Sequence, residues 1–156
     1  VLAMEERLDR AVEETLEPYG RSMPVAVLNH PASLIRVIVY RGTARLHAAD
    51  FLRAQGVAGN TAAQLQRLGF RRDKDFFTLG CQAVEAEYGC APGLFWRAMR
   101  LSPAVKQVVF LTADGFGRLL EIDPDLHRWL HGQVSAEWDR LLRLYLDCQR
   151  RKEGRE

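Results

Sequence analysis

The stretch that decides the fold is Arg45–Leu79, which reads RLHAADFLRAQGVAGNTAAQLQRLGFRRDKDFFTL. It begins with the end of a strand and continues through two short helical patterns separated by a glycine-containing turn. A basic loop then runs into a second strand. No catalytic motif elsewhere in the chain competes with this unit, so the remaining elements are interpreted as its support.

The two helical patterns are short and differ in their outer faces. The first covers Ala48–Gln55, and the second covers Ala62–Leu68 after a cap at Asn60 or Thr61. We expect the second helix to leave Gln and Arg side chains outward. Its expected buried residues are Ala62, Leu65 and Leu68.

Helix, turn and helix in this order predict a helix-turn-helix-like unit. A short helix bearing Gln and Arg fits the DNA major groove, where these side chains bond to base edges, and cations in the next loop can hold phosphates. The alternative is a charged loop that neutralises itself, because Asp73 and Asp75 lie among those cations. The candidate DNA-binding residues are Gln64, Gln66, Arg67, Arg71, Arg72 and Lys74.

The 156 residues suit a single domain. Runs rich in Val, Ile and Leu predict strands at Val25–Leu28, Leu34–Tyr40 and Val108–Thr112. Helical periodicity covers much of the remainder, which predicts an α+β domain with short antiparallel strands packed on several helices. The expected core includes Leu65, Phe76, Leu111 and Trp138.

Helices are expected at both ends of the chain. Met4–Tyr19 has an amphipathic pattern, and Pro124–Arg150 is predicted to be a long C-terminal helix with Arg150–Glu156 as a frayed tail. The last helix carries an apolar seam that either packs on the domain or pairs with a second copy in a homodimer. That seam consists of Val134, Trp138, Leu141, Tyr145 and Cys148.

Charge is unevenly distributed along the chain. Met4–Tyr19 holds six acidic residues and two arginines, a net charge of −4. Gly20–Phe76 holds nine Lys/Arg and three Asp, a net +6, whereas Leu111–Asp147 holds seven acidic residues and four arginines. A basic middle between acidic flanks either forms a one-sided positive face or spreads over the solvated surface.

Several classes of function find no support. Cys81, Cys90 and Cys148 have no zinc-ligand spacing, and an odd number of cysteines fits a reduced, cytoplasmic setting. His127 and His131 lie four residues apart without a third ligand nearby. With no signal peptide, no membrane-spanning run and no nucleophile motif, we expect neither an enzyme, nor a cofactor, nor a membrane partner.

Short motifs in this order resemble a known family. Ala48-Ala49-Asp50-Phe51 stands at the "(N/A)-R-D-L" segment, Gly69–Phe76 at "G-F-x-x-x-x-D-F", and Phe110–Thr112 at the later "Y-x-L-T" strand. The chain thereby resembles the N-terminal domain of phage antirepressors of the AntA/AntB type and, more loosely, the Bro and KilA-N domains. It departs from the pattern at Ala49, where the family has arginine, and in the long insert Gly80–Gln107.

The resemblance implies a regulator encoded by a phage or mobile element. Such a protein binds DNA to control transcription, or it binds and inactivates a repressor or another host protein. For the second role, we expect the contact on the aromatic-rich Leu94–Leu101 segment or on the last helix.

Overall fold

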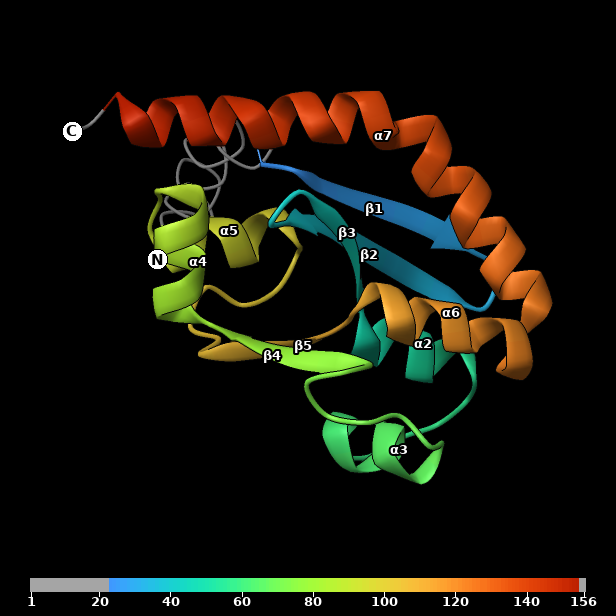
Figure 1. Cartoon of the computed structure of the whole chain (residues 1–156). Helices are drawn as coiled ribbons and strands as arrows, with labels where there is room; N and C mark the ends of the chain where they lie inside the picture. Colours follow the sequence, from blue (N-terminus) through green and yellow to red (C-terminus); the bar gives the residue numbers. More distant parts are fainter. Residues whose placement is uncertain (1–22, 155–156) are drawn as a thin grey trace, which may run out of the picture.

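The computed structural model describes residues 23–154, so the helix expected at Met4–Tyr19 lies outside the described residues. Within that range the protein is an α+β fold, as the sequence predicts, with one five-stranded antiparallel sheet and six helices (Figure 1). The strands are β1 (Val25–His30), β2 (Ser33–Tyr40), β3 (Thr43–His47), β4 (Phe76–Gly80) and β5 (Gln107–Leu111). The helices are α2 (Ala48–Ala54), α3 (Thr61–Arg67), α4 (Cys81–Tyr88), α5 (Pro92–Ala98), α6 (Ala113–Ile122) and α7 (Pro124–Glu153).

The sheet order is β1-β2-β3-β5-β4, and every neighbouring pair is antiparallel. The first three strands form a meander closed by tight turns. Pairing of β3 with β5 is short, with Leu46 opposite Leu111 and His47 opposite Phe110. This pairing joins the two halves of the sheet, and α2 and α3 lie in the connection between β3 and β4.

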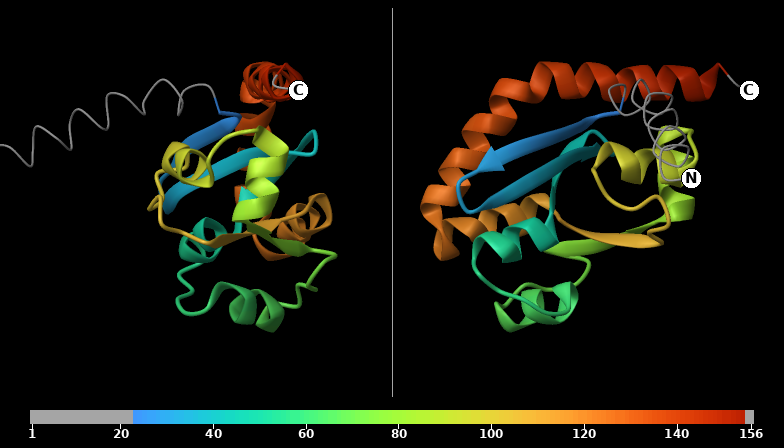
Figure 2. Two further views of the ribbon diagram at one scale, coloured as in Figure 1. Left: turned by 90° about the vertical axis from the view of Figure 1, so that its left-hand side faces the viewer. Right: turned by 180° about the vertical axis from the view of Figure 1, so that it is seen from behind.

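Each sheet face has its own apolar cluster, because successive strand residues point to opposite faces. One face packs against α6 and most of α7, with Val37, Leu46 and Leu111 among its buried residues. The other face packs against α4 and α5, where Phe95 and Trp96 are fully buried. Figure 2 shows α5 and α6 on opposite sides of the sheet. The aromatic pair of α5 is therefore core, and the Leu94–Leu101 segment does not offer these rings to a protein partner.

A buried ion pair fastens α2 to the sheet. Asp50 is fully buried, and its carboxylate accepts hydrogen bonds from the Arg36 side chain at 2.6 Å and 2.9 Å and from the Arg36 backbone at 2.8 Å. The guanidinium of Arg36 also donates to the Met99 carbonyl at 3.1 Å. His47 places Nδ1 3.0 Å from the same carboxylate. The pair thus joins β2, α2 and the end of α5.

The long C-terminal helix uses its apolar seam inside the chain. Leu141 and Cys148 are buried, Tyr145 donates to the Glu87 carboxylate at 2.7 Å, and Trp138 packs half-buried against the core. Leu65, Phe76 and Leu111 are fully buried core residues as predicted, whereas Trp138 belongs to the core only as a partly buried residue at its margin. A homodimer through α7 stays a prediction, and it would need outward residues such as Leu146, which is 48% exposed.

The helix also extends beyond its predicted end. α7 continues to Glu153, and Lys152 donates to the carbonyls of Ala86 and Glu87 at 3.0 Å and 3.2 Å. These bonds tie the helix end to α4, so a frayed tail beginning at Arg150 is wrong. Among residues 23–154, every helix is too short or too polar to cross a membrane.

Candidate functional site

The second short helix, α3, stands at one end of the molecule, away from α7 (Figures 1 and 2). Its N-terminus is capped by Asn60, whose side chain accepts a hydrogen bond from the Ala63 backbone at 3.0 Å, as the sequence predicts. Leu65 is the one buried residue of this helix. Gln66 and Arg67 are exposed. A single leucine therefore anchors a helix whose remaining surface is accessible or half-accessible.

The end of α3 explains why Leu68 is not buried. The backbone N–H of Phe70 bonds to the Leu65 carbonyl at 3.0 Å, and that of Gly69 bonds to the Gln66 carbonyl at 3.0 Å. These two bonds form a Schellman motif, with Gly69 at a φ of +93°. The motif returns Phe70 to the core and leaves Leu68 39% exposed. The prediction that Leu68 is buried is wrong, and Ala62 is only half-buried.

The basic loop after Phe70 is shaped by the buried carboxylate of Asp75, which is 1% exposed. Its Oδ2 accepts from the Arg71 backbone at 2.7 Å and lies 2.8 Å from Nε of Arg118 on α6. Burial alone raises the pKa of this carboxyl, but the Arg71 backbone bond and Arg118 outweigh it, so the pKa is lowered. Asp75 is therefore a charged internal anchor and not a free counter-charge on the loop.

α6 supports the same loop through its first turns. The Thr112 hydroxyl donates to the Lys74 carbonyl at 2.6 Å, and the Thr112 backbone donates to the Asp75 carbonyl at 2.9 Å. Thr112 also caps α6, because its hydroxyl accepts a hydrogen bond from the Gly115 backbone at 3.1 Å. A Cβ on Gly115 would overlap the carbonyl oxygen of Asp75. The loop thus rests directly on α6.

The six candidate DNA-binding residues lie within one segment that begins on α3 and ends in this loop. Five are exposed, namely Gln66, Arg67, Arg71, Arg72 and Lys74. Gln64 is half-buried and packs toward Gly59, where an added Cβ would come within 2.9 Å of its Nε2. The structure therefore gives Gln64 a less accessible position than the other five.

Within residues 23–76, the positive charge is not all gathered on the surface near α3. Arg36 is buried and paired with Asp50. Arg41 follows β2, and Arg45 on β3 lies over the ring of Phe77 at 5.4 Å. Arg41 is thus at the end of β3 opposite to the end that leads into α2 and α3. The cations near α3 are therefore only part of the positive charge of the middle region.

Sequence reasoning missed the residues that position this surface. Four of them, Asp75, Thr112, Gly115 and Arg118, fix the loop that displays the cations. The sequence places Asp75 in the "D-F" motif and offers it only as a counter-charge to the loop cations. Only the pairing of β4 with β5, which brings Phe76 opposite Leu111, places it beside α6.

The groups exposed at this surface are suited to recognition by hydrogen bonding. Amide, guanidinium and ammonium groups are exposed there, and these donate hydrogen bonds to phosphates and base edges. In residues 23–154, no cluster of three or more His, Cys, Asp or Glu side chains is arranged to hold a metal ion. Comparison with protein-family models, with curated proteins and with solved structures gives no match to this chain.

Proposed function

We propose that this protein is a DNA-binding transcription regulator that contacts duplex DNA with α3 and the loop after it. The observation that carries the proposal is the joint exposure of Gln66 and Arg67 on α3 with Arg71, Arg72 and Lys74 beside them. The resemblance to phage antirepressors supports a phage or mobile-element origin.

In the proposed complex, α3 enters the major groove. Its seven residues span about 10 Å at roughly 1.5 Å per residue, and the groove is about 12 Å wide. Gln66 and Arg67 then meet base edges, with Gln64 at the margin. Arg71, Arg72 and Lys74 hold the adjacent phosphates, which set position without reading sequence.

Replacing residues of the two groups should change DNA binding in different ways. Arg71→Ala or Lys74→Ala weakens binding to all duplexes alike and lowers the salt slope by about one unit. Gln66→Ala or Arg67→Ala relaxes preference at a base pair and costs about 1–3 kcal/mol. Fluorescence anisotropy with random and selected duplexes over a salt series measures both effects. Absence of duplex affinity at about 50 mM salt contradicts the DNA proposal.

Asp73 gives a test of opposite sign. It is exposed among the cations and has a φ of +66°, a conformation that asparagine tolerates. Asp73→Asn removes a negative charge next to the proposed phosphates and therefore strengthens duplex binding. The matched control is Asp139→Asn on α7, which is exposed but far along the chain from α3. Equal affinity in both variants argues against DNA at this surface.

A second candidate function is a protein-interaction module that binds and inactivates a repressor or another host protein. The exposed Leu68, next to Gln66 and Arg67, favours it because phosphates gain nothing from an apolar neighbour. Leu68→Asp then abolishes capture of the protein partner and leaves unfolding nearly unchanged. Retention of that partner by the variant would remove Leu68 from the contact.

A further inference from the structure

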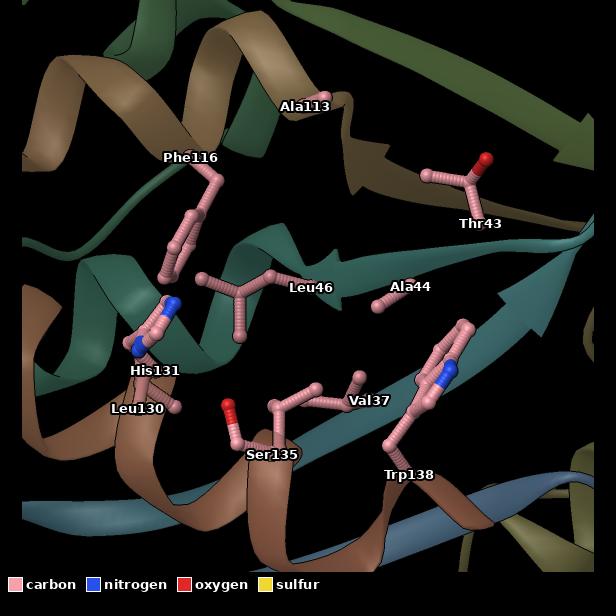
Figure 3. A pocket seen from close by; sticks show the side chains of 11 residues that line it. Val37, Thr43, Ala44, Leu46, Ala113, Phe116, Leu130, His131, Ser135 and Trp138 are labelled. Carbon is pink, nitrogen blue, oxygen red and sulfur yellow. The ribbon is translucent and has the colours of Figure 1, made fainter. Parts of the chain in front are cut away.

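A cavity of about 410 Å³ lies between the sheet and the two helices α6 and α7. Its floor is formed by Val37, Ala44 and Leu46 from β2 and β3. Figure 3 shows Phe116 of α6 at one side and Trp138 of α7 at the other, with Leu46 and Ala44 between them. The cavity shares no residue with α3 or the basic loop, so its interpretation is independent of DNA binding.

The space exists because small side chains stand between large ones. Ala44, Ala113 and Ser135 leave room between the rings of Phe116 and Trp138. The cavity is partly open to solvent, because His131 and Ser135 of its lining are exposed. Its volume of about 410 Å³ falls within the roughly 300–1,000 Å³ range of small-molecule sites.

The lining defines the chemistry of an occupant. Most of it is apolar, and it contains no Asp, Glu, Lys or Arg side chain. Its polar groups are the hydroxyls of Thr43 and Ser135, the ring of His131 and the indole N–H of Trp138. An ionised ligand would lose hydration here without gaining a fixed counter-charge. A neutral molecule with aromatic rings gains contacts with Phe116 and Trp138 and keeps one hydrogen bond.

The shape favours a small molecule over a partner helix. α6 ends at Ile122 and α7 begins at Pro124, so the two walls converge on Asp123. Leu119 and Leu126, which belong to these two helices near that junction, are buried in the core. The cavity is therefore closed toward the junction, whereas a helix about 10 Å across needs an open trough. We propose that this cavity binds a small, uncharged, ring-bearing molecule with a hydrogen-bonding group directed at Ser135 or His131.

The test uses N-phenylnaphthylamine, a neutral probe whose fluorescence rises in apolar surroundings. We expect saturable binding of one probe per full-length chain. Anilinonaphthalenesulfonate has the same rings plus a sulfonate, and it should bind about tenfold more weakly or worse because the cavity supplies no fixed positive charge. Equal affinity for the two probes contradicts an uncharged site.

Cavity-filling variants locate the probe. Ala44→Leu fills the floor from β3 and should weaken probe binding by about tenfold or more. The matched control is Ala136→Leu, because Ala136 is exposed on α7 and does not line the cavity. Ser135→Leu repeats the filling from the α7 wall in case Ala44→Leu does not fold, as judged by circular dichroism. No saturable binding by the wild type, or full affinity in a folded filled variant, overturns the proposal.

Discussion

Two buried aspartates show what single residues contribute to this fold. The carboxylate of Asp50 accepts hydrogen bonds from the Arg36 side chain. That of Asp75 accepts a hydrogen bond from the Arg71 backbone and forms an ion pair with Arg118. Both lie in the short motifs that resemble phage antirepressors, and in this structure both hold backbone segments together. The motif residues thus account for the local structure of the chain, and the regulatory activity stays a proposal about the exposed residues around them.

The carboxylate of Asp50 makes the free energy of unfolding depend on pH in the acidic range. Burial by itself raises the pKa of Asp50, but hydrogen bonds from Arg36 and His47 outweigh burial, so the pKa is lowered in the folded state. An unfolded Asp titrates near about pH 3.9. The stabilisation is therefore complete above that pH and is lost as pH falls below it toward the folded pKa.

We expect Asp50→Asn to lower the free energy of unfolding at pH 7 by about 3–5 kcal/mol, because it leaves Arg36 buried without its carboxylate. The variant should also lose part of the wild-type decline in stability below about pH 4. Urea unfolding at several pH values measures both effects, and Asp139→Asn, at an exposed position, serves as the control. A wild-type acid slope in Asp50→Asn would remove this carboxylate as its source.

At the scale of elements, the sequence predicted what depends on local chemistry. Hydrophobic periodicity located the strands and helices, and the cap at Asn60 is as expected. The helical repeat failed at Leu68, because the chain leaves the helix at Gly69 and Phe70 takes the buried place. The helical spacing of apolar residues does not predict which of them is buried where the chain leaves the helix.

The contrast between Leu65 and Leu68 gives an element-scale prediction. Leu65→Ala should cost about 2–5 kcal/mol of unfolding free energy, because the side chain is fully buried and leaves a cavity. Leu68→Ala should change it by less than about 1 kcal/mol, since this residue is 39% exposed. Thermal and urea unfolding of the two variants measures the difference. Equal losses would show that α3 does not depend on its single buried leucine.

At the scale of the whole molecule, the arrangement depends on long-range pairing. The register of Leu46 with Leu111 brings β3 beside β5, and Phe76 with Leu111 brings β4 to the other side. These contacts place α6 under the basic loop, although Asp75 and Arg118 lie far apart in the sequence. No local pattern encodes this pairing, so the support of the candidate surface could not be predicted from the sequence.

Two glycines of α6 test whether this support matters. Gly115 lies against the Asp75 carbonyl, whereas nothing lies within 4 Å of a Cβ added to Gly117. We expect Gly115→Ala to push the loop away from α6 and to lower stability by about 1–3 kcal/mol through overpacking. Gly117→Ala should instead raise stability by about 0.5–1 kcal/mol, as alanine does inside a helix.

Hydrogen exchange at residues 71–76 reports the loop directly. Gly115→Ala should speed exchange at the Asp75 and Phe76 amides, which bond to the Arg71 carbonyl in the wild type at 2.8 Å and 3.4 Å. If the surface binds DNA, the same variant should also weaken duplex affinity while every cation remains in the chain. Gly117→Ala should leave exchange and affinity at wild-type values. Unchanged exchange in Gly115→Ala would mean that α6 does not hold the loop.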